Sequence, residues 1–232
     1  EIGMGAEHFN LDQFGAEVAY TLDGDSEGEI QYENFNACKA EFEIRGFNVH
    51  PGEGKDTMIN ASLVAIEINN CLPSMETPRG TEDYEGFYHL ISMQGEVGEA
   101  KLNYIVRDHD KNGFEERKKT LRLIEKNLNA KWGEGTVTLK ITDQYLNMKE
   151  IVEEHMHLID HAKKACEAAG VAPLILPIRG GTDGCQLSFK GLPCPNLGTG
   201  GHAFHGPYEH ISVEGMEKSV ELLLALIQEY TK

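Results

Sequence analysis

The sequence predicts an α/β protein that is interrupted by an inserted α+β unit. Apolar segments of strand and helix length lie at both ends of the chain, and between them runs a central segment with the order β-α-β-β-α-β. The first segment is too short to form a domain alone, so we expect it to pair with the last one. The predicted division is residues 1–34, 35–146 and 147–232.

The first segment is acidic and rich in glycine. Residues 16–22 (AEVAYTL) are mostly apolar and predict a buried strand, and the DGDSEGE that follows predicts a turn. Asp23 therefore comes directly after a strand, at the kind of sheet edge where sites of α/β proteins usually lie.

The central segment predicts a four-stranded sheet with two helices. The strands are predicted, from alternating or apolar patterns, at residues 38–49, 88–93, 100–106 and 136–142. One helix is predicted near residues 60–70. A second, amphipathic helix is predicted at residues 111–131, with an inward face of Phe114, Leu121, Ile124 and Leu128. This order is ferredoxin-like, with both helices on one face of the sheet.

The last segment returns to α/β character. A helix is predicted at residues 151–169, ending at Gly170 as a C′ glycine, and a short strand at residues 174–178. Ser212 is the predicted N-cap of a final helix that runs to about Tyr230. The predicted core residues of that helix are Leu222, Leu223, Leu224, Leu226 and Ile227.

Composition excludes several classes of function. The chain is 40% hydrophobic and 25% charged, which is typical of a globular protein. Lys and Arg number 21 against 38 Asp and Glu, a net charge of −17, which argues against nucleic acid and anionic membranes as partners. No apolar run approaches a membrane span. No secretory signal is visible, and the five cysteines form no CxxC pair, so we expect reduced thiols in the cytoplasm.

Three residues far apart in the sequence could bind a metal. Glu1 and Asp23 offer carboxylates, and His205 offers an imidazole in the Gly-rich segment GGHAFHG. These donors suit zinc or another divalent cation. The alternative is that Asp23 is a turn residue and His205 an ordinary loop histidine.

The segment IRGGTDG, residues 178–184, offers groups that could bind substrate. Arg179 suits a carboxylate or phosphate, and Asp183 could anchor Arg179 or bind an amine. Phosphate binding is disfavoured because a Walker loop would require Gly-Lys-Ser/Thr. The alternative is a helix N-terminus with Thr182 as its cap.

Two further residues are expected at strand ends in the central segment. His50, before Pro51, could donate to a developing oxyanion, or it could be a surface turn residue. Arg107 could bind a substrate carboxylate, or it could form a structural pair with Asp108 or Asp110.

Six motifs occur in one collinear series along the whole chain: EIGMGA, YTLDG, NVHPG, YIVRDHD, PIRGGTDGCQLSFKGLPCPNLGTGG and FHG. This series resembles the M20 metallopeptidase family, and within it the tripeptide aminopeptidases. The resemblance implies a zinc-aminopeptidase-type catalytic domain, only partly present, that is interrupted by a ferredoxin-like lid domain.

The resemblance also implies a role for each candidate residue. Glu1, Asp23 and His205 would be zinc ligands, and His50 would be the lid histidine that polarises the scissile carbonyl. Arg107 and Arg179 would face the substrate. The family's general-base Glu is expected just before Glu1, and its first metal His and bridging Asp lie further upstream, so none of these three can be matched here.

The implied function is a cytoplasmic zinc-dependent aminopeptidase that releases the N-terminal residue from tripeptides, with two Zn2+ ions per site and a homodimer formed through the lid. These 232 residues alone are expected to be inactive because they lack the base. Two alternatives stay open. One is a dipeptidase or N-acyl amino acid deacylase of the same family, and the other is a non-catalytic lid or dimerisation module.

Overall fold

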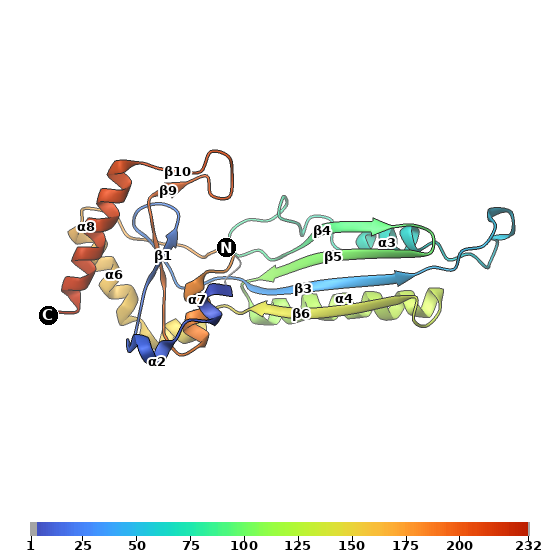
Figure 1. The fold of residues 1–232 in the computed structure, drawn as a ribbon, viewed down its shortest axis with the longest axis horizontal. Coiled ribbons are helices and arrows are strands. Elements are labelled where there is room, and N and C mark those ends of the chain that lie inside the picture. Colours follow the sequence, from blue (N-terminus) through green and yellow to red (C-terminus); the bar gives the residue numbers. More distant parts are fainter. Residues whose placement is uncertain (1–3, 232) are drawn as a thin grey trace. The chain divides into compact units, whose positions relative to one another are not determined.

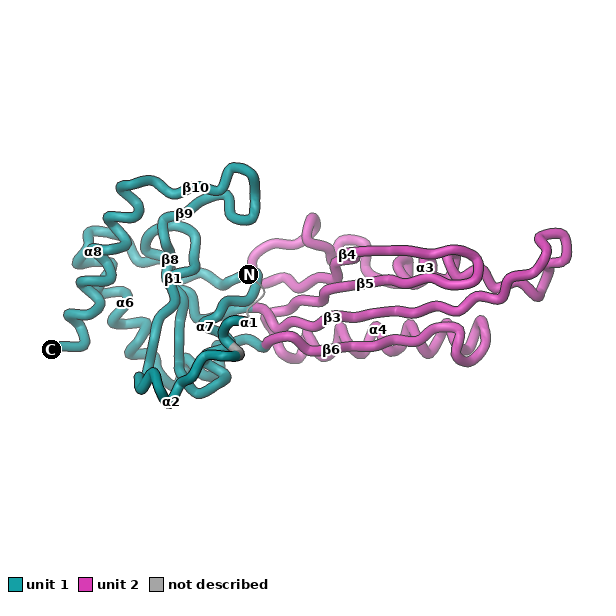
Figure 2. The backbone as a smooth tube through the Cα atoms, viewed as in Figure 1, with its two compact units in different colours: residues 1–34, 146–232 teal, residues 35–145 magenta. Residues whose placement is uncertain are grey.

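The structure, a computed structural model, describes residues 4–231 except for the side chains of Met4 and Glu7. It divides into two compact units, shown in Figure 2. Unit 1 consists of residues 1–34 and 146–232, and unit 2 of residues 35–145. The predicted fold class, an α/β chain with an inserted α+β unit, is confirmed.

Unit 2 is a four-stranded antiparallel sheet with two helices on one face (Figure 1). The strand order is β4 (Phe87–Gly95), β5 (Glu99–Asp108), β3 (Asn36–Arg45) and β6 (Val137–Tyr145). The helices are α3 (Ala61–Asn70) and α4 (Lys111–Trp132). This is the predicted ferredoxin-like arrangement.

Local sequence explains why both helices begin where they do. The Asn60 side chain accepts a hydrogen bond from the Leu63 amide at 3.3 Å, and that of Asp110 accepts one from the Gly113 amide at 2.6 Å. Both are N-caps that satisfy amides left free at a helix start. All four residues of the predicted inward face of α4 are buried, namely Phe114, Leu121, Ile124 and Leu128.

The first strand of unit 2 is shorter than predicted. β3 ends at Arg45, not at residue 49, because β5 begins opposite it at Glu99 and β6 at Val137, so both ladders stop there. The Gly46 amide donates instead to the Gly98 carbonyl at 2.8 Å, in the turn before β5. Gly46 then passes close to other backbone, and a Cβ there would lie 2.0 Å from the Val97 carbonyl oxygen. His50 therefore does not end a strand. It lies in the loop that follows, as the N-cap of the short 3-10 helix η1 (Pro51–Glu53).

Unit 1 contains a small mixed sheet and several helices. The strand order is β1 (Thr21–Gly24), β8 (Asn196–Gly198), β2 (Glu29–Gln31) and β7 (Leu174–Ile175), with β8–β2 antiparallel and the other pairs parallel. Short helices α1 (Met4–Glu7) and α2 (Leu11–Phe14) precede it. Helix α6 (His157–Ala168) packs beside α8 (Val213–Glu229), and α7 (Asp183–Phe189) lies between β7 and β8 in the sequence.

Two strand predictions in unit 1 are wrong in their bounds. The strand predicted at residues 16–22 is β1, at Thr21–Gly24. Its partner β8 is preceded by Pro193 and Pro195, which accept bonds from Ala19 and Thr21 but have no amide to donate, so a ladder forms only after them. The strand predicted at residues 174–178 is only two residues long, and Pro177 follows closely.

The helix predicted at residues 151–169 is interrupted. It consists of α5 (Lys149–Val152), the 3-10 turn η2 (Glu153–His155) and α6. Its end is as predicted, because Gly170 has φ +73° and the amide of Val171 bonds back to the carbonyl of Cys166.

The final helix starts as predicted but buries less of its surface. The Ser212 hydroxyl accepts from the Gly215 amide at 2.9 Å. Leu222 and Leu226 are buried, whereas Leu224 and Ile227 are 57% and 61% exposed, so these two were wrongly predicted as core. Leu222 and Leu226 are four residues apart and share the face of α8 that packs on its neighbour. Leu224 and Ile227, two and five positions after Leu222, lie on other faces.

A two-stranded hairpin joins the sheet of unit 1 to α8. It consists of β9 (Gly201–His202) and β10 (His210–Ile211), and neither strand was predicted. Within residues 4–231, no helix combines the length and apolar character that crossing a bilayer requires.

Candidate functional site

Three of the predicted site residues are electrostatic neighbours in unit 1. Asp23 lies near the end of β1, Asp183 begins α7, and His205 lies in the loop of the β9–β10 hairpin. Burial raises the pKa of the Asp23 carboxyl, the charge of Asp183 raises it further, and the imidazole of His205 lowers it. The fold therefore brings together residues that are up to 182 positions apart in the sequence.

The predicted metal-binding role of these residues stays a prediction. Glu1, the third predicted ligand, lies outside the described residues. Within residues 4–231, no group of three His, Cys, Asp or Glu side chains could hold a metal ion. Asp23 and His205 thus supply two donors of the right chemistry, carboxylate and imidazole, and a complete ligand set needs others.

A chain of hydrogen-bonded polar side chains runs across the sheet of unit 1. The Thr21 hydroxyl donates to Asn196 Oδ1 at 3.0 Å, and Asn196 Nδ2 donates to Gln31 Oε1 at 2.5 Å. Gln31 Nε2 in turn donates to Glu29 Oε2 at 3.0 Å. None of these four residues was predicted from the sequence, although polar side chains within such short strands are a usable signal. Asn196, Gln31 and Glu29 are buried and Thr21 is partly buried, and together their hydrogen bonds hold β1, β8 and β2 in one register.

The backbone of His205 is in an unusual conformation. Its φ is +59°, in the left-handed region, and its amide donates to the Glu209 carboxylate at 2.9 Å. Such a conformation costs a non-glycine residue on the order of 1 kcal/mol and persists only where surrounding contacts hold it. Glu209, whose carboxylate holds this loop, was not predicted from the sequence.

Asp183 and Arg179 flank the start of α7. The Thr182 hydroxyl accepts from the Cys185 amide at 3.3 Å, so the predicted helix N-terminus with Thr182 as cap is confirmed. Ile178 forms an isolated parallel bridge with Asn34, and this fixes the backbone just before Arg179. The cap does not exclude binding by these side chains, since Asp183 is exposed and Arg179 is partly exposed.

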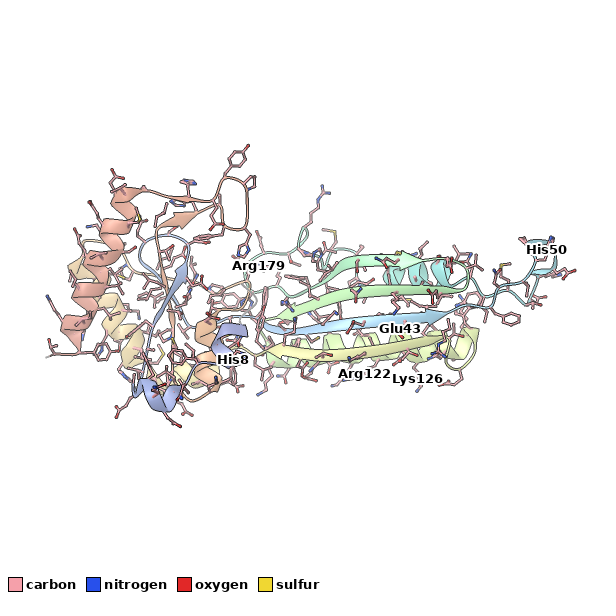
Figure 3. All side chains as sticks on the ribbon, in the orientation of Figure 1. His8, Glu43, His50, Arg122, Lys126 and Arg179 are labelled. Atoms are coloured by element: carbon pink, nitrogen blue, oxygen red, sulfur yellow. The ribbon has the colours of Figure 1, made fainter. Side chains whose placement is uncertain are left out.

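His50 lies in unit 2 on the loop beyond β3, where Figure 3 labels it. Its side chain is exposed, and its Nδ1 accepts a hydrogen bond from the Gly52 amide at 3.2 Å. Because Nδ1 accepts, the neutral ring carries its proton on Nε2. His50 therefore occupies a surface turn and also offers an N–H donor, so its predicted role remains a prediction.

Arg107 is buried within the sheet of unit 2. Its Nη1 donates to the carbonyls of Val106 and Cys38 and to Gln144 Oε1, at 3.1, 3.4 and 3.2 Å. The guanidinium also lies over the Tyr145 ring, 5.2 Å from its centroid, and burial lowers the Arg107 pKa. Its role toward a substrate carboxylate stays a prediction.

The alternative predicted for Arg107, a pair with Asp108 or Asp110, is wrong. Asp108 accepts instead from Arg117 Nε at 2.7 Å, and Asp110 is the N-cap of α4. Both carboxylates are therefore engaged by groups on α4, namely Arg117 and the Gly113 amide.

Comparison with known proteins supports the resemblance that the motifs indicate. Residues 32–136 match a family described as the peptidase dimerisation domain of M20 proteins. A peptidase T from Clostridium perfringens is 55% identical over 232 residues, which is 100% of this chain and 57% of that protein. This chain resembles peptidase T along its whole length. Its resemblance to the M20 family is confirmed, and it spans a little more than half the length of the curated peptidases T that it matches.

Solved structures agree on the fold. An aminopeptidase PepT from Bacillus cereus gives a TM-score of 0.85 at 22% identity, covering 100% of this chain and 62% of that one. A dinuclear metal binding peptidase of the M20 family from Bacillus subtilis gives a TM-score of 0.68 at 16% identity, covering 97% and 62%. At these identities the likeness establishes the fold that this peptidase T relative shares with them.

Proposed function

We propose that this chain supplies the lid and part of the catalytic unit of a zinc-dependent aminopeptidase that releases the N-terminal residue from tripeptides. The observation that carries the proposal is the 55% identity to a peptidase T along the whole chain. Because the chain covers 57% of that relative, the activity is proposed for a whole enzyme.

The residues of unit 1 fit a zinc site in their chemistry. Asp23 and His205 would each bind zinc, since carboxylate oxygen and imidazole nitrogen are usual zinc donors and their charges already interact. Glu1 would be a further ligand, and two Zn2+ ions per site are proposed, with the general-base Glu just before Glu1. When bound, zinc lowers the pKa of a coordinated water and so activates it for attack on a carbonyl.

Other residues of this chain would bind and orient the peptide. His50 would donate its Nε2–H to the developing oxyanion, a role supported by the tautomer that the Gly52 amide imposes. Asp183 would bind the substrate's free amine. Arg179 and Arg107 would bind its carboxylate, and holding both ends of a short peptide would reject longer chains.

Two properties of the whole enzyme follow from the same resemblance. We propose a homodimer formed through residues 32–136, which match a dimerisation domain. We also propose a cytoplasmic location, on the basis of an odd number of cysteines without a disulfide pattern.

Two other functions are consistent with the same observations. A dipeptidase or N-acyl amino acid deacylase could use the same donors with a different substrate. A non-catalytic dimerisation module is favoured by one observation, the match of residues 32–136 to a dimerisation domain.

A chimeric enzyme tests these proposals. The upstream part of the Clostridium perfringens peptidase T would be fused before Glu1 and assayed with Zn2+ on a tripeptide, a dipeptide and an N-acetyl amino acid. We expect tripeptide hydrolysis that chelation abolishes. Asp23→Asn and His205→Asn should lower kcat/KM on the order of 100-fold or more, since even residues that only support metal ligands are worth about 10–100-fold. Asp25→Asn, an exposed neighbour, is the control.

The outcomes separate the candidates. Preference for the N-acetyl amino acid would replace the aminopeptidase with a deacylase. A folded, zinc-loaded chimera without turnover would overturn the enzyme proposal. Arg179→Ala should raise KM for tripeptides more than for dipeptides, and an equal effect on both would remove Arg179 from the proposed carboxylate site.

A further inference from the structure

Two histidines face each other on the β9–β10 hairpin. His202 and His210 are direct cross-strand partners in the antiparallel register. Their ring centroids are 5.4 Å apart and the rings are tilted by 40°. Directly opposite residues project from the same face of a two-stranded ribbon, and both side chains are exposed.

One of these rings is already oriented by a hydrogen bond. His210 Nδ1 lies 2.7 Å from the carbonyl oxygen of Tyr208. A carbonyl can only accept, so Nδ1 carries the proton and the lone pair of a neutral His210 is on Nε2. Histidines that bind metals usually donate their other ring N–H to such an oxygen, which fixes the tautomer and makes the free nitrogen more basic.

The ring separation suits a single ion. Two imidazoles on one tetrahedral zinc, with bonds of about 2.0–2.1 Å, place their centroids about 5 Å apart. We propose that His202 and His210 together bind one borderline divalent transition ion, of which Zn2+ is the representative, with solvent completing its coordination.

The hairpin is held in place before any ion binds. The Gly201 amide donates to Thr199 Oγ1 at 3.0 Å, and the Ser219 hydroxyl on α8 donates to the Thr199 carbonyl at 2.7 Å. The Phe204 ring covers Gly201, where a Cβ would lie 2.6 Å from its edge. The backbone at the start of the hairpin that carries the two imidazoles is therefore already ordered, which favours affinity.

A second histidine pair in unit 1 makes a natural comparison. His157 and His161 are four residues apart on α6, the spacing that places two histidines on one helix face. Their centroids are 5.9 Å apart at an angle of 76°, and the His161 ring packs edge-on against Tyr230 at 4.7 Å. That packing engages His161 with an aromatic ring, so we assign the ion to the hairpin.

The site is separate from the catalytic zinc proposed above and does not depend on it. His205 lies between the two hairpin histidines in sequence, but its left-handed backbone and its amide bond to Glu209 belong to the loop and not to the strand pair. A substitution of His205 is therefore expected to weaken the proposed catalytic zinc site and to leave the His202–His210 site intact.

Calorimetric titration of the metal-free 232-residue chain with ZnCl2 at pH 7.5 tests the inference. We expect His202→Asn and His210→Asn each to weaken one binding event at least tenfold, and the double variant to lose that event entirely. His205→Asn should leave it intact, as should His8→Asn, an exposed histidine of the same unit labelled in Figure 3. Far-UV circular dichroism checks that each variant is folded.

Nitrogen-15 NMR of the histidine rings gives a second readout. On adding Zn2+, Nε2 of His210 should shift while its Nδ1 keeps its proton. Unchanged stoichiometry in the folded double variant would overturn the site. So would transfer of the loss to a His157→Asn, His161→Asn variant, or zinc bound at Nδ1 of His210.

Discussion

The two units hold their sheets together by different means. In unit 2, strands of nine or ten residues pack an apolar face under two helices, and Phe42, Leu102 and Leu121 are fully buried. In unit 1, strands of two to four residues are joined by the polar chain from Thr21 through Asn196 to Gln31. The apolar sheet has long regular elements, and the polar one carries most of the candidate site. We therefore expect unit 2 to fold without the rest of the chain, whereas unit 1 contains most of the candidate site residues.

The largest expected effect is that residues 35–145 fold without unit 1. The two ends of this segment meet, because Ala37 pairs with Tyr145 across β3 and β6, and the core cluster lies wholly within it. The isolated segment should give a cooperative urea transition and a dispersed NMR spectrum. An unfolded or molten segment would show that the core of unit 2 depends on contacts outside it. The proposed difference between the two units would then be wrong.

The next effect concerns the apolar core. Leu102→Ala should lower the free energy of unfolding by about 3 kcal/mol, because a buried leucine leaves both a transfer loss and a cavity. Leu123→Ala on α4, where the side chain is 55% exposed, should change it by about 0.5 kcal/mol or less. Urea denaturation of both variants measures the difference. Equal effects would mean that β5 is not at the centre of this core.

The same contrast explains what sequence could predict. Long elements with regular apolar spacing were found because their burial is periodic. The prediction for α4 differs by one residue at its end, and the predictions for the strands of unit 2 differ by one to four residues at each end. The helix ends at Ser212, Thr182 and Gly170 could also be predicted, because each of these residues acts on amides or carbonyls only a few positions away in the sequence.

Unit 1 was harder because its structure depends on distant partners. The start of β1 is set by Pro193 and Pro195, more than 170 residues away, and β8 to β10 are too short to have a period. Asp23, Asp183 and His205 were selected individually, but their proximity is a property of the fold. Glu209 was missed because it accepts from the His205 amide, and Asn196 because it bonds to Thr21 and Gln31. Neither contact follows from a helix or strand period.

A smaller effect is expected in the polar sheet. Asn196→Ala removes the partner of both Thr21 and Gln31 and leaves the buried Gln31 Oε1 without its donor, which should cost about 2 kcal/mol. Gln228→Ala, at an exposed position on α8, is the matched control. Hydrogen exchange should show faster opening of β1, β8 and β2, with unit 2 unchanged. Uniform acceleration in both units would indicate that they open as one.

The smallest effect is electrostatic and tests whether Asp23 and Asp183 are neighbours. Burial and the charge of Asp183 raise the Asp23 pKa, so between the unfolded and the folded pKa the folded chain binds more protons than the unfolded one. Stability therefore falls as pH rises through that interval, and the loss persists at neutral pH. Asp183→Asn should lower the Asp23 pKa and reduce this fall, although burial keeps the pKa above its ordinary value.

Carboxyl carbon-13 NMR titration in the presence of a chelator would measure the Asp23 pKa directly. His205→Asn should move the pKa in the opposite direction, upward, because the imidazole favours the carboxylate. Opposite shifts from the two variants would tie α7, β1 and the hairpin loop to one electrostatic site. An Asp23 pKa that neither variant changes would separate them and leave Asp23 as an ordinary turn residue at the end of a strand.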